Sequence, residues 1–427
     1  MSGSEEASRD GAGVGASRAM RIVTRSAART VAWMCLAHAA SMIGFSTYAT
    51  LLPQLQREWA LNNSEAGFIS GAFFAGYMAA VPVLTSLTDR VDARRIYFVS
   101  ALAVAAASLG LASIASGLAT AAGMQFVAGA GIAGTYMPGL RALTDNVSGP
   151  SRSRAVSFYT ATFGLGTSAS ILLAGAIAAT LGWHWAFGLS AVGPLVAGAM
   201  VIAGLPPRPP RHAQTARVLD FRPVFASREL RAYVLGYAVH CWELFGSRSW
   251  LVAFFVFGEG LAAAPGAWSP AGIVAAANLG GLAASILGNE IAMRHGRERT
   301  IWKAMLASGL LSCALGFAAS LPWYLLAALA VLHLVLIMGD SSALTAGVVE
   351  RAEERIRGTT MAVYSMLGFG AGFASPLVFG IVLDLAGGNA SVAAWGFAYA
   401  SLGLGAIFVS LLIRRHAKAL RATGKFA

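Results

Sequence analysis

Long apolar stretches fill most of this chain, and they constrain its fold more than any other feature. A helix needs roughly 20 mostly apolar residues to cross the hydrocarbon core of a bilayer. We therefore predict an all-α membrane protein with twelve transmembrane helices. The expected spans lie near residues 31–53, 64–88, 95–116, 118–142, 153–180, 184–204, 230–257, 268–291, 300–319, 322–348, 357–383 and 393–413.

The composition agrees with a bilayer as the solvent and excludes several other classes of protein. Hydrophobic residues make up 57% of the 427 residues and charged residues only 12%, well outside the range of soluble proteins. The net charge of +12 does not indicate a nucleic-acid partner, because the basic residues lie in short connectors rather than on one helix face. Cys35, Cys241 and Cys313 lie inside apolar stretches, so we expect no metal, no disulfide framework and no cofactor.

The arginine distribution predicts the orientation in the membrane. If the N-terminus is inside, the outer connectors contain only Arg57, whereas the inner connectors are rich in arginine, as the positive-inside rule requires. Residues 1–29 lack the apolar core of a signal peptide. Arginine far outnumbers lysine, and alanine and glycine are abundant. We therefore expect a multi-pass protein of a bacterial inner membrane, with both termini in the cytoplasm.

The chain also divides into two halves. The longest inner connector, at 205–228, is rich in proline and arginine and lies almost midway along the sequence. We expect six-helix bundles at 30–204 and 229–415, with cytoplasmic tails at 1–29 and 416–427. The halves echo one another at a nearly constant sequence separation, which indicates a duplicated fold. His38 and Gly44 match His240 and Gly246, and Tyr159 matches Tyr364.

The connector between the second and third spans carries the most specific motif. It reads Thr85-Ser-Leu-Thr-Asp89-Arg90-Val-Asp92-Ala-Arg94-Arg95, which resembles the signature loop of the Major Facilitator Superfamily. The resemblance implies that Asp89 and the arginines Arg90, Arg94 and Arg95 form a charged latch that gates the two bundles. The alternative is a solvated positive-inside loop. Thr85 and Asp92 stand where the family usually has glycine.

This resemblance extends over about residues 30–415 and implies more than a fold. It implies two pseudo-symmetric six-helix bundles around a central cavity, and secondary active transport by alternating access in a protein that acts as a monomer. Gln125 departs from the family pattern, because proton-coupled exporters usually have an arginine there. The resemblance does not identify the substrate.

The seventh span holds the richest set of polar residues in the membrane. His240 and Glu243 fall on one helix face, and Arg248 flanks it. An arginine keeps its charge at any usable pH and offers a planar fork that fits carboxylate-like anions. Arg248 therefore predicts an anionic substrate. The alternative is a structural ion pair with Glu243 or Asp340.

Asp340 follows Gly339 near the middle of the tenth span. A buried carboxyl group can take up and release a proton, as a proton carrier requires. We identify Asp340 and Glu243 as the candidates for proton coupling. Asp340 has an alternative role, in which its side chain binds a loosened backbone beside Gly339.

Further candidates for the substrate site are polar or aromatic residues at equivalent or nearby positions. His38 and His240 are equivalent in the two halves, so we expect two imidazoles facing each other across the cavity, where they bind substrate or relay protons. Each could instead bind a neighbouring helix. Orienting hydrogen bonds are expected from Tyr136, Tyr159, Asn278 and Tyr364, and an apolar wall from Trp242.

Two functions remain open within this family. The first is a proton-coupled carrier, such as a symporter, of a small anionic solute, with the proton and the lipid bilayer as its other partners. The second is an efflux antiporter of drugs or metabolites. An enzyme is disfavoured, because the chain has no His-Glu-x-x-His zinc motif, no Gly-x-Ser-x-Gly elbow and no phosphate-binding loop.

Overall fold

The computed structural model describes residues 28–147, 151–207, 221–262, 268–353 and 356–422, and almost all of these are helical. The first helix covers residues 28–41. It is followed by α2 (Thr47–Glu58), α3 (Asn63–Leu87), α4 (Ala93–Ser113), α5 (Leu118–Asn146), α6 (Ser151–Leu181), α7 (Trp183–Ser190), α8 (Val192–Gly204), α9 (Arg222–Ala226), α10 (Arg228–Leu261), α11 (Pro270–His295), α12 (Arg297–Leu315), the 3-10 turn η1 (Gly316–Ala318), α13 (Trp323–Met338), α14 (Ser341–Arg351), α15 (Arg357–Leu385) and α16 (Val392–Ala422).

Every expected span coincides with helix, but three of the spans are interrupted. The first is broken by turns at residues 42–46 before α2 begins. The sixth is divided into α7 and α8 at Ala191, because Pro194 cannot donate to the carbonyl of Ser190 and its ring clashes with that group. The tenth is divided into α13 and α14 at Gly339 and Asp340.

Within the described residues, nine helical segments are long and apolar enough to cross a membrane. The three other expected spans are helical but do not reach that standard. The span at 31–53 is interrupted, α5 is rich in glycine and threonine, and α10 carries Glu243 and Arg248 near its middle. The helical membrane fold is therefore confirmed, whereas nine of the twelve expected spans meet the standard of length and apolarity within the described residues.

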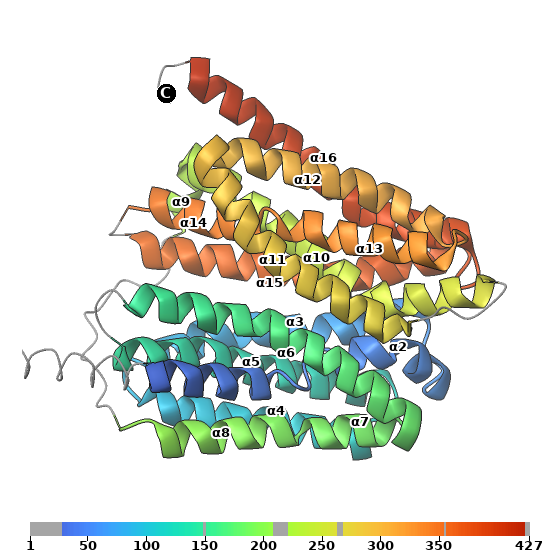
Figure 1. The fold of residues 1–427 in the computed structure, drawn as a ribbon, viewed down its shortest axis with the longest axis horizontal. Helices are drawn as coiled ribbons and strands as arrows, with labels where there is room; N and C mark the ends of the chain where they lie inside the picture. Colours follow the sequence, from blue (N-terminus) through green and yellow to red (C-terminus); the bar gives the residue numbers. More distant parts are fainter. Residues whose placement is uncertain (1–27, 148–150, 208–220, 263–267, 354–355, 423–427) are drawn as a thin grey trace, which may run out of the picture.

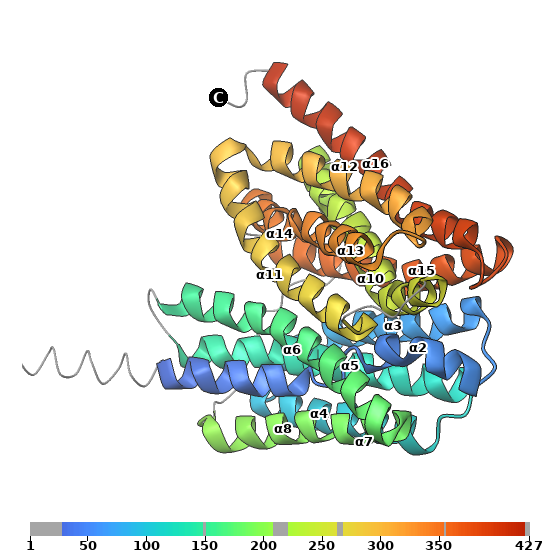
Figure 2. The same ribbon diagram turned by 45° about the vertical axis from the view of Figure 1, so that its right-hand side comes forward.

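The two halves of the chain form two bundles that lie side by side (Figure 1). Residues 28–204, coloured blue to green, form one bundle, and α10 to α16, coloured yellow-green to red, form the other. Figure 2 shows α6 and α11 diverging toward the start of α6 and the end of α11. Much of the expected 205–228 boundary and of both tails lies outside the described residues, so these domain limits stay a prediction; α16 continues as helix to Ala422.

The bundles meet at the end where α3 begins and α15 ends, which we call the closed end. Glycines allow backbones to touch there: a side-chain carbon at Gly67 would lie 2.2 Å from the carbonyl oxygen of Pro376, and one at Gly380 would lie 2.1 Å from that of Asn63. Asp384 accepts hydrogen bonds from the backbone N–H groups of Asn63 and Ser64, at 3.1 and 2.8 Å, and from both of their side chains. An acid of one bundle therefore caps the first turn of α3 in the other.

Candidate functional site

A pocket lies between the two bundles, and helices of both contribute to it. The space between its side chains is about 560 Å³, including its open mouth. The helices α2, α3, α5 and α6 line it from the first bundle, and α10 and α11 from the second. Its polar lining residues are Ser46, Thr50, Ser70, Gln125, Thr167, Arg248, Ser249 and Asn278.

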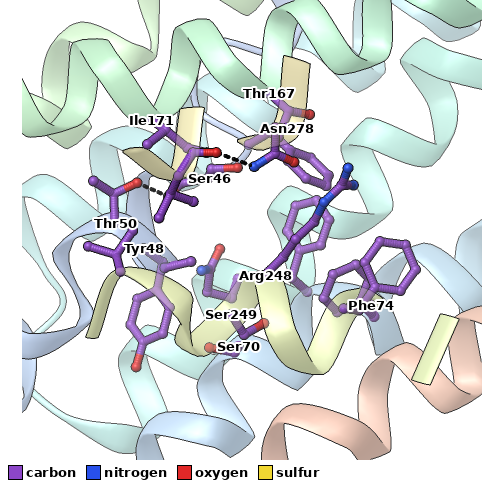
Figure 3. Close-up of a pocket in the computed structure, with 17 residues that line it drawn as sticks. Ser46, Tyr48, Thr50, Ser70, Phe74, Thr167, Ile171, Arg248, Ser249 and Asn278 are labelled. Atoms are coloured by element: carbon purple, nitrogen blue, oxygen red, sulfur yellow. Dashed lines mark hydrogen bonds between the residues drawn. The ribbon is translucent and has the colours of Figure 1, made fainter. Parts of the chain in front are cut away.

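Arg248 is the single charged residue among those that line this pocket. Its side chain extends from α10 into the pocket, between Asn278 and Phe74 (Figure 3). Within the described part of the chain, no ion pair or hydrogen bond to its guanidinium group is formed, and its Nε is buried without a partner. A permanent positive charge therefore lies in a mostly apolar site without a protein counter-ion.

The two acids considered as partners of Arg248 contact histidines instead. His240 Nδ1 lies 2.6 Å from Asp340 Oδ1, and both side chains are only 2% exposed. The two atoms are in close contact, although the angles are not those of a hydrogen bond. Asp340 directly precedes α14, but its side chain forms no capping hydrogen bond. Asp340 thus faces His240 across the break in the tenth span.

Glu243 lies in a second buried contact of the same kind. Its Oε1 is 3.3 Å from His333 Nε2 on α13, and its Oε2 accepts a hydrogen bond of 2.8 Å from Ser308 on α12. Glu243 is 2% exposed and His333 is fully buried. The second bundle therefore contains two separate pairs of a carboxyl group and an imidazole, and neither pair lines the pocket.

His38 is enclosed by aromatic rings of the first bundle. Its ring lies 4.5 Å from that of Tyr159 in a stacked arrangement and 5.2 Å from that of Tyr136. The hydroxyl group of Tyr159 donates to the carbonyl oxygens of Thr135 and Tyr136. Since His38 and His240 are each buried within their own bundle, the expected pair of imidazoles facing each other across the cavity is not formed.

The remaining residues predicted for the substrate site separate into two groups. Asn278 lines the pocket together with Arg248. Tyr364 instead stacks on Tyr237 at 3.8 Å within the second bundle, and Trp242 donates to the carbonyl oxygen of Ser401 at 3.2 Å. The structure therefore brings two of the eight predicted residues together at the pocket, while substrate binding by any of them stays a prediction.

The charged residues of the predicted gating loop contact residues outside the loop as well as one another. Asp89 is 3.7 Å from Arg141 near the end of α5, and both side chains are partly exposed. Arg94 contacts Asp92 at 3.0 Å and donates to the carbonyl oxygen of Leu205 at 2.5 Å. Arg90 and Arg95 are exposed. These contacts link the loop to α5 and to the end of α8, all in the first bundle.

Several residues of these networks were not found from the sequence as site candidates, namely Arg141, Asp384, Ser308 and Ser70. Arg141 is one of many arginines near the ends of the helices, so its pairing with Asp89 had no distinct signal. The partner of Asp384 is more than 300 residues away in the sequence. In the described part of the chain, no group of three or more His, Cys, Asp or Glu residues could hold a metal ion.

Both the sequence and the fold resemble those of known proteins. A model described as Major Facilitator Superfamily matches residues 34–376. "Protein spinster homolog 3" from Danio rerio is 26% identical over 186 residues, which are 43% of this chain and 37% of that protein. The match thus spans well under half of that relative's length.

Several solved structures resemble most of the chain, rather than less than half of it. A bacterial homologue of the human lysosomal transporter Spinster, in an inward-facing and unoccupied conformation, has a TM-score of 0.69 at 14% identity, covering 91% of this chain and 95% of that one. A POT family transporter in complex with 5-aminolevulinic acid has a TM-score of 0.74 at 11% identity, covering 92% and 96%. The nucleoside transporter NupG has a TM-score of 0.73 at 12% identity, covering 90% and 99%. At these identities the likeness concerns the fold.

Proposed function

Because this chain belongs to the Major Facilitator Superfamily, and is therefore a membrane transporter rather than an enzyme, we propose that it carries a small anionic solute together with protons. The observation that carries the proposal is Arg248, a charged residue in a pocket between the bundles without a protein counter-ion. A buried charge is unfavourable unless an opposite charge approaches it. The solute supplies that charge. The fork of a guanidinium group fits a carboxylate in two parallel hydrogen bonds.

Proton coupling is supported by the two carboxyl–imidazole contacts. Carboxyl groups and imidazoles inside membrane-spanning segments form the proton relays of many transporters, so each contact is a candidate site for a carried proton. Asp340 and Glu243 each lie in the same bundle as Arg248, and Glu243 is on the same helix. Movement of the bundles therefore changes the surroundings of the proton sites together with those of the pocket.

Alternating access requires that the closed end opens, and Asp384 joins the bundles there through its hydrogen bonds to the start of α3. We expect Asp384→Asn to shift the protein toward conformations that are open at this end, because the helix-capping carboxylate is lost. The measurement is the distance between spin labels at Arg57→Cys and Asn389→Cys, in a background without the three native cysteines. Asp384→Asn should add a longer distance to the distribution.

Glu65→Gln is the matched control, because Glu65 caps the same helix but binds only Asn62 of its own bundle. An unchanged distance distribution in Asp384→Asn, or an equal shift in both variants, would remove the role of Asp384 in closure.

The loop after α3 is proposed to gate the opposite end. Asp89→Asn should slow transport severalfold while ligand affinity stays unchanged, because the contact with Arg141 is exposed and far from the pocket. Initial uptake rates are measured in proteoliposomes and ligand affinities on the protein in detergent, for Asp89→Asn and for the wild type. Wild-type transport rates in Asp89→Asn would show that the loop is only a solvated connector.

The orientation follows from the arginine asymmetry, which supports placing both termini and the 205–228 connector in the cytoplasm of a bacterial inner membrane. The closed end then faces the periplasm. A reporter that is active only in the cytoplasm should be active when fused after residue 427. Activity of a periplasmic reporter at this position would reverse the proposed orientation.

The alternative function, efflux of drugs or metabolites, has one observation in its favour. Four phenylalanine rings, from Phe45, Phe73, Phe74 and Phe245, line the pocket, and aromatic walls suit apolar drugs. A cationic or neutral drug, however, leaves Arg248 without a counter-ion. The test that separates the two functions is a ligand-stabilisation screen of the purified protein against carboxylates, inorganic anions and common drugs. Stabilisation by drugs alone would favour efflux and contradict the anionic solute.

A further inference from the structure

We infer that the solute is a singly charged organic acid that carries a hydroxyl group beside an apolar group and lacks an ammonium group. This inference rests on the proposed binding of an anion at Arg248 and adds the rest of the molecule. It follows from three properties of the pocket: its charge, its unpaired hydrogen-bonding atoms and its aromatic wall.

The charge of the pocket limits the charge of its ligand. Arg248 contributes one positive charge, and no Asp, Glu, Lys or His is among the residues that line this pocket. A dianion such as sulfate would keep one negative charge uncompensated in an apolar site, which is unfavourable. An amino acid or a peptide would place its ammonium group near Arg248 without a carboxylate to receive it. A single carboxylate is the group that balances the site.

The hydroxyl group is inferred from Asn278. Its Nδ2 donates to the carbonyl oxygen of Val274 at 2.9 Å, which fixes the orientation of the amide because only the nitrogen can donate to a carbonyl. The Oδ1 that remains is buried without a partner. An amide oxygen accepts hydrogen bonds, so a ligand that satisfies it must donate one.

Ser70, on α3 of the first bundle, adds to this requirement. Its Oγ is also buried without a partner, and it lines the same pocket. A hydroxyl group both donates and accepts, so a hydroxyl-bearing ligand satisfies Asn278 or Ser70 from either bundle. A carboxylate alone only accepts and leaves the Asn278 oxygen unpaired.

An apolar group on the ligand is inferred from the aromatic wall. The ring of Phe45 lies 5.1 Å from that of Phe73, and the ring of Phe74 lies 4.2 Å from that of Phe245 on the other bundle. Apolar surface placed against these rings leaves water, which is favourable. Inorganic anions have no such surface.

Two matched sets of compounds test the inference: lactate, propionate and alanine, and the larger 3-phenyllactate, 3-phenylpropionate and phenylalanine. Each set differs in one group, namely hydroxyl, hydrogen or ammonium. We expect the hydroxy acid to bind roughly tenfold more tightly than the acid without a hydroxyl group, because the latter leaves a buried acceptor unpaired. The amino acid should not bind measurably. Affinities come from thermal stabilisation and titration calorimetry of the full-length protein.

The variant Asn278→Leu should remove the preference for the hydroxy acid while the carboxylate still binds, because Leu is similar in size but cannot accept a hydrogen bond. Equal affinities for the hydroxy acid and its deoxy partner in both sets, or binding of the amino acids, would overturn the inference. If other anions bind in an Arg248-dependent way without a hydroxyl preference, the inference fails and the proposed function stands. If no anion stabilises the wild type, the proposed function itself fails.

Discussion

Arg248→Gln is expected to reduce the affinity for the anionic solute at least roughly a hundredfold, because charged hydrogen bonds in a desolvated site are worth about 1.5–3 kcal/mol each and two are lost. Arg248→Lys keeps the charge but loses the planar fork, so we expect a smaller loss of roughly tenfold. The measurement is titration calorimetry with the best ligand of the screen. Arg141→Gln serves as the control, because Arg141 contacts Asp89 and Asp145 outside the pocket.

The stability of the unliganded protein gives a second result from the same variants. A buried charge without a partner destabilises the folded state, so Arg248→Gln should leave the melting temperature unchanged or raise it. If Arg248 were part of a structural ion pair, its removal would leave a buried carboxylate without a partner and would lower the melting temperature. A clear fall in stability would therefore contradict the absence of a protein counter-ion.

Asp340→Asn is expected to abolish accumulation of the solute against its gradient. For a monovalent anion carried with one proton, a gradient of one pH unit supports roughly tenfold accumulation, since one unit corresponds to about 1.36 kcal/mol. Without a titrating group at residue 340, the accumulation ratio should fall to about one. Exchange of labelled for unlabelled solute needs no net proton movement and should continue.

Glu243→Gln is the paired variant, because Glu243 has the same type of contact with a histidine. Uptake into proteoliposomes with an imposed pH gradient, compared with exchange at equal pH, gives the measurement for both variants. Loss of accumulation in Glu243→Gln but not in Asp340→Asn would assign coupling to Glu243. Full accumulation in both variants would contradict proton coupling through these acids.

The positions of most helices could be predicted from the sequence, because the length of an apolar stretch depends on local composition. The break at Ala191 was also predictable in principle, since Pro194 interferes with the carbonyl of Ser190, four residues earlier. The break at Gly339 agrees with the loosened backbone that was considered there from the sequence, whereas the close approach of α11 at this point had no signal in the sequence. A side-chain carbon at Gly288 would lie 1.9 Å from the carbonyl oxygen of Gly339.

The site could be predicted only in part, and α10 explains why. The spacing of His240, Glu243 and Arg248 gives their angular separation around the helix, but not which face meets the pocket. The face of a helix that is turned to the pocket can be predicted when one side of the helix is polar and the other apolar. This does not hold for α10, which is packed by both bundles and is apolar on most sides. In the structure His240 and Glu243 face their own bundle, and Arg248 turns to the pocket. The histidine partners of Asp340 and Glu243 therefore could not be predicted, because they depend on contacts between helices that are distant in the sequence.

The most direct test of the central claim, that the solute is the counter-ion of Arg248, is a comparison of ligand affinity in single and double variants. Arg248→Gln is measured alone, with Glu243→Gln and with Asp340→Asn. If either acid were the true partner of Arg248, neutralising both members would restore binding and stability together. We predict that all three variants are folded and that none binds the anion. Recovery of anion binding in either double variant would contradict the account.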